Sequence, residues 1–372
     1  MAGGSTFTWC HALRLDSNKS PFASPLPKTH TAFSDVQPVS HTRHNIAGLL
    51  TTVYGVSELP QLPSAVVCLW LLHGRGDTQD SMAYTAAAML KAWNTDKRRR
   101  NEGGKGLICV CFDQRNHGSR MIENANNVSW KQGNPTHGLD MFNTYAGTAH
   151  DLSLLIAQIQ HYLPFKISEH ICGGVSLGGH ATWNVLMREP RVTAGMVVIG
   201  CPDYIRLMTD RAIRSKVPST LTSDPPGKDF LGSKDFPQSL IATVEEHDPA
   251  GILLSELDVY SPHDVRHDPS ESEVKRLRPI IERTLAGKKI ICLSGGKDGL
   301  VPYAQSEPFL SWLKRAVDKE NGWAKDQGIE LEDVVDAESG HAFSAVMRKE
   351  AERWLCDLLS DETRHSNRDF KL

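Results

Sequence analysis

Short apolar runs alternate with longer amphipathic stretches along most of this chain. The apolar runs have the length and residue types of buried strands and predict strands at 65–72, 106–112, 170–175, 194–200, 289–294 and 331–336. The stretches between them carry apolar residues at helical spacing, which predicts helices at 81–93, 148–162, 304–317 and 343–359. This alternation is typical of an α/β fold, a mostly parallel sheet flanked by helices. An antiparallel edge strand is expected at 48–54.

Two polar stretches, 119–147 and 203–287, interrupt the alternation. The second is too long for a turn, so we expect it to form a cap over the carboxyl ends of the strands, where open α/β sheets bind ligands. A capping box at Ser270 and Glu273 predicts the start of a helix within it. The predicted domains are a weakly patterned segment at 1–35, an α/β core at 36–202 and 288–361, a cap at 203–287 and a polar tail at 362–372.

Composition narrows the class of protein. The chain has 372 residues, a formal net charge of −3 and 40% hydrophobic residues, as an ordinary globular protein does. Without a bulk basic surface, nucleic acid is not expected as a partner. The longest apolar run, 65–72, is far shorter than the ~20 residues that cross a bilayer, and the N-terminus shows no secretory signal.

The eight cysteines form no CxxC pair and mostly lie in apolar runs, which indicates buried reduced thiols of an intracellular protein. Neither a disulfide framework nor a metal site is expected, and the location expected is cytoplasmic. The ending Phe370-Lys371-Leu372 is similar to the peroxisomal Ser-Lys-Leu signal, with an aromatic residue replacing the small one. The sequence carries no signal for an oligomeric state.

The chemistry centres on the pentapeptide Gly174-Val175-Ser176-Leu177-Gly178. It follows the apolar run 171–175 and opens a helix-like stretch at 180–187. A serine hydroxyl becomes a good nucleophile when a tight strand-to-helix turn presents it beside a base, and glycines two residues to either side let the backbone make that turn. Ser176 is therefore the predicted nucleophile.

A serine nucleophile needs a base and an acid that orients the base. Asp298 lies on a glycine-rich turn just after the strand predicted at 289–294, and His341 lies on a loop after the next strand. Both positions let the side chain reach the serine from the same edge of the sheet. A turn-forming aspartate and a structural histidine are the alternatives for these two residues.

The developing oxyanion needs backbone donors. We expect them to be the N–H of Arg75, in the turn His73-Gly74-Arg75-Gly76, and the N–H of Leu177 at the start of the following helix. Gly74, His117 and His137 are further candidates for substrate contact, and a solvated loop is an equal alternative for His137. The polar run that begins at Asp113 is expected to form a hydrogen-bonded corner beneath the site.

Taken in order, these landmarks resemble the α/β-hydrolase superfamily: His73-Gly74-Arg75-Gly76, Asp113-Gln114-Arg115-Asn116-His117-Gly118, Gly174-Val175-Ser176-Leu177-Gly178, Asp298 before Val301-Pro302, and Gly340-His341. The resemblance spans about 65–359 and implies an eight-stranded sheet with Ser176, Asp298 and His341 as the triad. The second motif departs from the commoner form Asp-x-Arg-Gly-His-Gly-x-Ser, since Asn116 replaces a glycine and Arg120 the final serine. That departure prevents assignment to a subfamily.

These residues predict a serine hydrolase that cleaves a carboxylic ester or thioester of a small-molecule acyl substrate through an acyl-enzyme, without a metal or organic cofactor. Serine rather than aspartate at the nucleophile position disfavours epoxide hydrolase and dehalogenase chemistry. Two alternatives remain open. The same triad serves an acyltransferase with an alcohol or thiol acceptor, and the fold also occurs in binding proteins without catalysis.

Overall fold

The computed structural model describes residues 32–96, 98, 104–258 and 268–360. Several sequence expectations lie outside these residues, namely Cys10, most of the 1–35 segment, the 362–372 tail and its last three residues. The seven described cysteines are all buried and free of disulfides, as the sequence predicts. No helix in the described ranges combines the length and apolar character that a membrane span requires.

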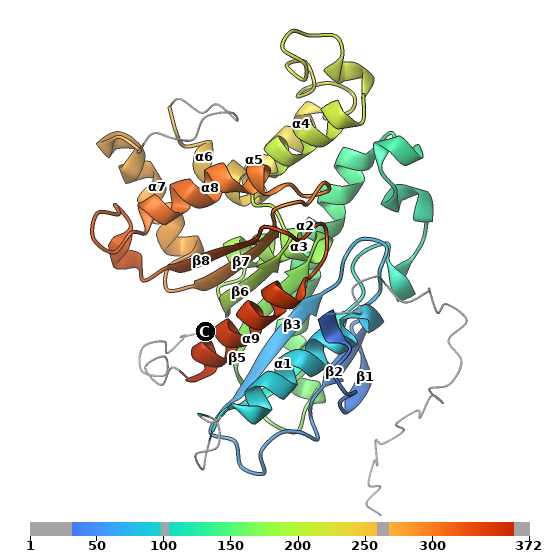
Figure 1. Cartoon of the computed structure of the whole chain (residues 1–372), viewed down its shortest axis with the longest axis vertical. Coiled ribbons are helices and arrows are strands. Elements are labelled where there is room, and N and C mark those ends of the chain that lie inside the picture. Colours follow the sequence, from blue (N-terminus) through green and yellow to red (C-terminus); the bar gives the residue numbers. More distant parts are fainter. Residues whose placement is uncertain (1–31, 97, 99–103, 259–267, 361–372) are drawn as a thin grey trace, which may run out of the picture.

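A single eight-stranded sheet forms the centre of the molecule (Figure 1). Its strand order is β1-β2-β4-β3-β5-β6-β7-β8. The first two strands pair antiparallel with each other and β2 pairs antiparallel with β4, whereas all other neighbours are parallel. The strands are β1 His41–Ile46, β2 Leu49–Tyr54, β3 Val66–Leu72, β4 Gly106–Phe112, β5 Ile167–Val175, β6 Val192–Val198, β7 Lys289–Gly295 and β8 Glu330–Asp336. The predicted mostly parallel eight-stranded sheet is confirmed.

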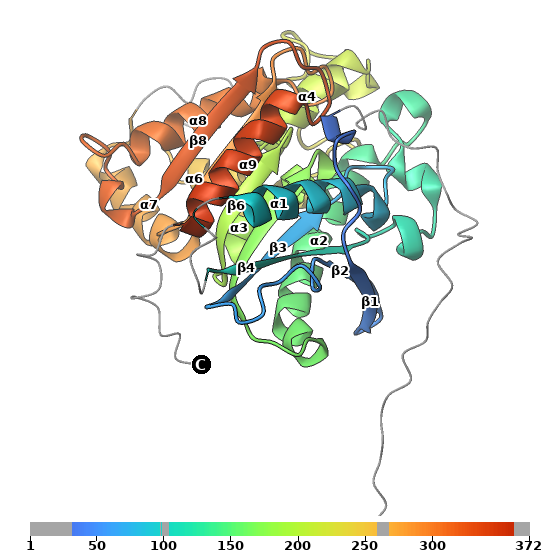
Figure 2. The ribbon, with the colours of Figure 1, turned by 60° about the horizontal axis from the view of Figure 1, so that its bottom comes forward.

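The central strands are apolar along their whole length because both of their faces are covered. Every residue of β3 and of β4 is buried, as expected for parallel strands with helices on both sides. β1 lies at the sheet edge (Figure 2), and most of its residues are exposed. Its sequence, HTRHNI, has no apolar run, so the sequence pattern did not place a separate strand there.

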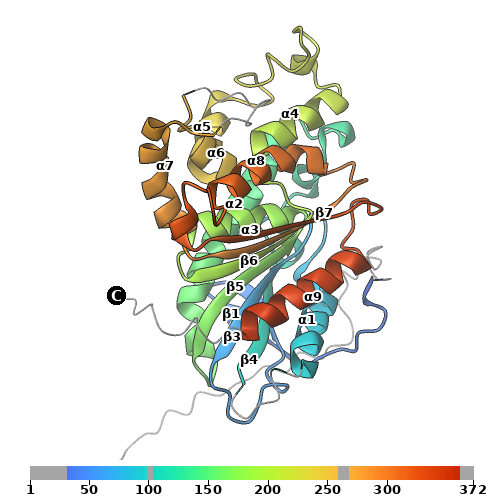
Figure 3. The same ribbon diagram turned by 60° about the vertical axis from the view of Figure 1, so that its left-hand side comes forward.

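Helices cover both faces of the sheet (Figure 3). α1 and α9 pack together on one face, with the side chains of Val67, Leu69 and Leu71 from β3. α2 and α3 lie on the opposite face, which receives Cys68, Trp70 and Leu72. The helices are α1 Ala83–Thr95, α2 His137–Gln158, α3 Leu177–Arg188, α4 Tyr204–Arg214, α5 Gln238–His247, α6 Pro249–Leu254, α7 Glu271–Thr284, α8 Tyr303–Ala316 and α9 Ala345–Ser360.

The polar stretch at 119–147 differs from the expectation. α2 begins at His137, so the second half of this stretch belongs to a helix of the core. Gly147 does not break the helix: a Cβ at this position would lie 2.4 Å from Nη1 of Arg115, so the missing side chain makes room for that guanidinium. The remaining residues, 119–136, form a loop with short 3-10 turns.

The stretch between β6 and β7 contains α4, α5, α6 and α7. Its capping box is confirmed: the Glu273 amide donates to Ser270 Oγ at 3.4 Å, and the Ser270 amide donates to Glu273 Oε2 at 2.6 Å. α5, α6 and α7 all contact α3. The stretch therefore packs onto the helix that follows Ser176.

The last residues of the weakly patterned segment pack against α9. The ring of Phe33 is buried and lies 5.4 Å from the ring of Phe343. The Arg348 guanidinium lies 5.2 Å from the Phe33 ring and donates to Asp35. These contacts fix the start of the described chain on the face that carries α1 and α9.

Candidate functional site

Ser176 occupies a sharp turn between β5 and α3. Its backbone has φ 57° and ψ −112°, a conformation that costs a non-glycine residue on the order of 1–3 kcal/mol. A Cβ on Gly174 would lie 2.1 Å from the Gly178 carbonyl oxygen, and a Cβ on Gly178 would lie 2.0 Å from that of Leu72. Both glycines are therefore required where the strand, the turn and the helix meet.

Three side chains from separate loops form one hydrogen-bonded chain. Ser176 Oγ lies 2.9 Å from His341 Nε2, and His341 Nδ1 lies 2.8 Å from Asp298 Oδ2. Asp298 is buried, and its other oxygen accepts from the amides of Leu300 at 2.8 Å and Val301 at 2.9 Å. Because the carboxylate faces Nδ1, this arrangement favours the tautomer with the proton on Nδ1 and a free lone pair on Nε2 toward the serine.

Two glycines bring the loops of Asp298 and His341 together. A Cβ on Gly295 would lie 2.5 Å from the Gly340 carbonyl oxygen, and a Cβ on Gly296 would lie 2.8 Å from Ala337 Cα. Gly295 ends β7, and the loop after the neighbouring strand β8 carries the histidine. Close backbone contact of these two loops holds the acid beside the base.

The turn that follows β3 lies against the serine. A Cβ built on Gly74 would lie 3.8 Å from Ser176 Cβ. Leu177 is the first residue of α3, so its amide has no acceptor within its own helix. Arg75 and Leu177 both line the pocket at the serine.

A pocket with an empty volume of about 250 Å³, open to solvent, lies at the serine. Among the residues that the structure describes, no aspartate or glutamate lines it. Its lining residues are Arg75, Met141, Ser176, Leu177, His180, Arg211, Leu300, Val301 and His341.

Two histidines expected at the substrate are not among the residues that line this pocket. His117 is buried, with Nδ1 2.8 Å from the Arg115 carbonyl oxygen, and burial lowers its pKa. His137 is also buried, with its ring 5.0 Å from the Trp130 ring and Nε2 3.4 Å from Nη1 of Arg211. Burial, followed by the charge of Arg211, lowers the pKa of His137. Its ring is therefore neutral, and Nε2 can accept a hydrogen bond from the Arg211 guanidinium.

The pocket also contains residues that the sequence analysis did not select. Arg211 lies on α4 among the buried residues Leu207, Met208 and Ala212. An arginine on the apolar face of an amphipathic helix is a signal that could have identified it. His180 lies on α3, one helical turn after the serine.

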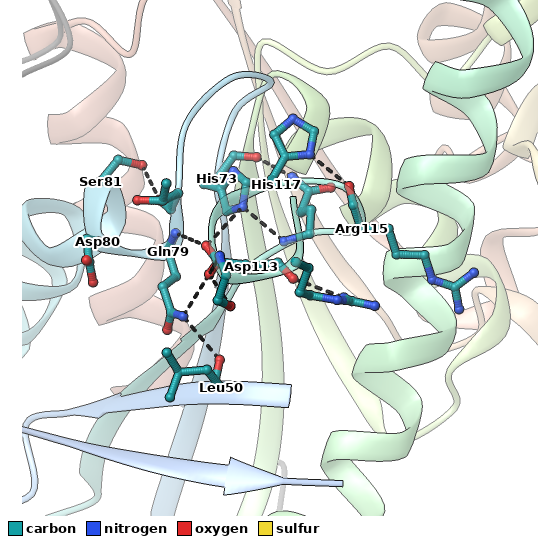
Figure 4. Close-up of polar contacts among 12 residues, drawn as sticks. Leu50, His73, Gln79, Asp80, Ser81, Asp113, Arg115 and His117 are labelled. Carbon is teal, nitrogen blue, oxygen red and sulfur yellow. Dashed lines mark hydrogen bonds and ion pairs between the residues drawn. The ribbon is translucent and has the colours of Figure 1, made fainter. Parts of the chain in front are cut away.

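The Asp113 corner is confirmed as a dense hydrogen-bond network (Figure 4). Asp113 accepts from the amides of Gln79 at 2.7 Å and Ser119 at 2.8 Å. Burial lowers the pKa of His73 to about 4. Its neutral ring lies with Nδ1 2.8 Å from the Gly74 carbonyl oxygen and accepts at Nε2 from the Gln114 amide at 3.0 Å. The network therefore anchors the turn that carries Arg75.

The two departures from the common second motif have a structural explanation. Asn116 has φ 55°, a conformation that asparagine adopts more readily than most side chains. Ser119 rather than residue 120 supplies the hydroxyl that bonds Asp113, at 2.8 Å. Arg120 instead donates to the Asp113 carbonyl oxygen and pairs with Asp151 at 2.8 Å. The hydrogen bonds to Asp113 are therefore kept, but Ser119 and Arg120 supply them.

No known family model matches this chain, and no curated protein matches it. Among solved structures, TT1662 from Thermus thermophilus is similar with a TM-score of 0.51 and 16% identity, over 88% of this chain and 100% of that one. The chain has the α/β-hydrolase fold. A Pyrococcus horikoshii acylaminoacyl peptidase is similar with a TM-score of 0.49 and 15% identity, over 92% of this chain. The hydrolase fold described here spans only 45% of that peptidase. At these identities the likeness concerns the fold alone.

Proposed function

We propose that this protein is a serine hydrolase that cleaves a carboxylic ester or thioester through an acyl-enzyme on Ser176. The observation that carries the proposal is the chain of short contacts from Ser176 Oγ through His341 to Asp298. A serine, an imidazole and a buried carboxylate in this order are the parts of nucleophilic acyl transfer. The α/β-hydrolase fold supports the same reading.

The reaction begins with attack of Ser176 Oγ on the acyl carbonyl while His341 Nε2 takes the hydroxyl proton. Asp298 holds the ring by Nδ1 and stabilises its positive form. The tetrahedral intermediate collapses, and His341 gives the proton to the leaving alcohol or thiol. A water molecule then loses a proton to His341 and attacks the acyl-enzyme, which releases the acid and restores the serine.

The oxyanion of the intermediate would accept hydrogen bonds from the amides of Arg75 and Leu177, which both line the pocket. Leu177 also lies at the N-terminus of α3, where the helix dipole favours negative charge. Loss of one such donor typically costs roughly 3–4 kcal/mol of transition-state stabilisation. The network at Asp113 contributes by fixing the turn that positions Arg75.

We further propose that the 203–287 stretch acts as a cap together with the 119–136 loop. Tyr204 Oη donates to the Gly138 carbonyl oxygen at 2.6 Å. The ring of Trp130 packs at 5.8 Å against that of Phe230. Arg211 brings α4 into the pocket wall. Such a cover would limit the access of water and select the acyl group.

Labelling with a fluorophosphonate probe tests the proposal. The wild-type protein should react, whereas Ser176→Ala should not and His341→Ala should react several orders of magnitude more slowly. Ser239→Ala is a matched control, because Ser239 is exposed on α5, and it should react like the wild type. A folded wild-type protein that resists the probe would contradict the proposal and favour a binding protein. Product analysis with an added alcohol or thiol acceptor would separate hydrolysis from acyl transfer.

A further inference from the structure

Arg211 is a buried cation that has no acidic partner in the part of the chain that the structure describes. It is only 9% exposed. Its guanidinium donates to the Leu300 carbonyl oxygen at 2.8 Å and to Met141 Sδ at 3.0 Å, and it lies 3.4 Å from His137 Nε2. Within the described ranges no carboxylate pairs with it, and burial lowers its pKa to about 10. A buried charge left without a counter-ion is costly.

Arg75 is a second cation on the same pocket. Its guanidinium donates to the Asn127 carbonyl oxygen at 3.1 Å, and burial lowers its pKa as well. Asp77 lies in the same turn, but in the described part of the chain it forms no ion pair with Arg75 or Arg211. The positive charge of Arg75 acts on Arg211 and lowers the pKa of that residue. The two like charges are therefore close enough to repel each other.

Two other poorly exposed arginines of this protein have acidic partners. The Arg348 side chain is 11% exposed and bonds both Asp35 and Glu352. Arg120 pairs with Asp151. Arg211 thus differs from Arg348 and Arg120 in having no carboxylate beside it in the described part of the chain.

His180 adds a buried ring nitrogen without a hydrogen-bond partner. Its Nδ1 lies 3.0 Å from the Cys201 amide nitrogen and 3.1 Å from the Cys201 carbonyl oxygen. In the tautomer that accepts from the amide, the proton of the neutral ring is on Nε2. Burial lowers the pKa of His180 to about 3, which keeps the ring neutral. Nε2 is buried without a hydrogen-bond partner, and the residue lines the pocket.

We propose that the group missing from this pocket is a carboxylate of the substrate, so that the natural acyl donor is a monoester or monothioester of a dicarboxylic acid. The carboxylate would accept from the guanidinium groups of Arg211 and Arg75, with His180 as a further donor. Guanidinium and carboxylate match in charge and in planar geometry. The inference rests on the proposed hydrolase function, which supplies the reacting carbonyl at Ser176.

Arg211 also bonds the loop of Asp298 through the Leu300 carbonyl oxygen, so a purely structural role must be distinguished. A structural defect would impair neutral and anionic substrates alike. Loss of a carboxylate contact would change the preference between them.

The test compares p-nitrophenyl esters of equal chain length: the adipate monoester, the hexanoate and the 6-aminohexanoate, each corrected for spontaneous hydrolysis. We expect kcat/KM to be at least tenfold higher for the adipate monoester than for the hexanoate, and lowest for the 6-aminohexanoate. Arg211→Gln and Arg75→Gln should each reduce the adipate-to-hexanoate ratio at least tenfold, and Arg211→Lys should retain more of it. Arg278→Gln, in an exposed pair with Asp326, is the matched control and should keep the wild-type ratio.

Equal rates for the adipate and hexanoate esters would overturn the inference, and so would a ratio that falls as far in Arg278→Gln as in Arg211→Gln. Titration of Ser176→Ala with adipate and with hexanoate by calorimetry gives a readout that needs no turnover. Adipate should bind at least tenfold more tightly. Fluorophosphonate labelling without adipate preference would refute the carboxylate site alone, whereas adipate binding without labelling would refute the hydrolase function alone.

Discussion

At the scale of single residues, the site depends on glycines that let backbone segments touch. Gly178 lies where α3 passes over the end of β3, so any side chain there would meet the Leu72 carbonyl oxygen at 2.0 Å. Gly299 lies next to Asp298, but a Cβ at this position would have no heavy atom within 4 Å. These two glycines of the same site therefore differ in whether the surrounding structure leaves room for a side chain.

We expect Gly178→Ala to destabilise the protein by about 3 kcal/mol or more, because overpacking against backbone cannot be relieved by a side-chain rotation. Gly299→Ala should change the free energy of unfolding by less than about 0.5 kcal/mol. Urea denaturation followed by tryptophan fluorescence measures both values. A Gly178→Ala protein as stable as Gly299→Ala would contradict the close contact at the turn.

Sequence reasoning selected Ser176, Asp298 and His341 because each follows a recognisable strand, and the carboxyl ends of neighbouring parallel strands meet at one edge. Arg211 was not selected, since its position at the pocket depends on how the 203–287 stretch packs back onto the sheet. No local pattern encodes that packing. His137 was a candidate for substrate contact or for a solvated loop, but it is buried, with its ring 5.0 Å from that of Trp130.

At the scale of elements, α4 begins at a buried N-cap aspartate with one unpartnered oxygen. Asp203 Oδ1 accepts from the Arg206 amide at 2.9 Å, but its Oδ2 is buried without a partner. Burial raises the pKa of Asp203 to about 6, although the cap itself lowers it. The neighbouring Asp248 is also buried, and its pKa is raised mainly by its own burial and then by Asp203. The charge at the start of α4, the helix that carries Arg211, therefore depends on pH.

We expect stability to fall as pH rises through the Asp203 transition. The folded protein holds this proton up to about pH 6, whereas the unfolded chain releases it near pH 4, so folding binds a proton between these values. Asp203→Asn retains the cap but cannot ionise. The stability of the variant relative to the wild type should therefore rise by about 3 kcal/mol between pH 4 and pH 7. Thermal or urea unfolding at both pH values checks this, and a constant difference would contradict the raised pKa.

Element prediction succeeded where the apolar pattern was continuous and failed where tertiary contacts override it. β3, β4 and β7 were all placed within one residue of their bounds, because buried parallel strands are apolar along their length. The predicted start of α2, residue 148, lies eleven positions after the residue where the helix begins, His137. Its first turns contain glycines and polar residues that lower helix propensity. Packing against Trp130 and Tyr204 stabilises those turns.

At the scale of the whole molecule, two segments remote in sequence join above the sheet. The 119–136 loop contributes Trp130, and the stretch after α4 contributes Phe230 and Phe236, whose rings lie 5.2 Å apart. Both phenylalanines are fully buried. This aromatic contact couples the loop that bonds Arg75 with the helix that carries Arg211.

We expect Trp130→Ala to increase amide hydrogen exchange in 119–136 and in 218–236 together, without an increase in β3, β5 or β7. The reason is that each segment loses a buried ring contact with the other, whereas the sheet keeps its own core. Trp323→Ala is the control: Trp323 is also half-buried and contacts one aromatic ring, that of Trp312. Exchange that rises in only one of the two segments would show that they are not coupled.

The distance along the chain between Ser176 and His341, 165 positions, has a consequence for biosynthesis. A ribosome adds roughly 5–20 residues per second, so the imidazole is made about 8–30 s after the hydroxyl that it would activate in the proposed reaction. Throughout that interval the nascent chain carries an alcohol with ordinary reactivity. An arrested or prematurely terminated product that stops before residue 341 would be chemically harmless, whatever esters surround it in the cell.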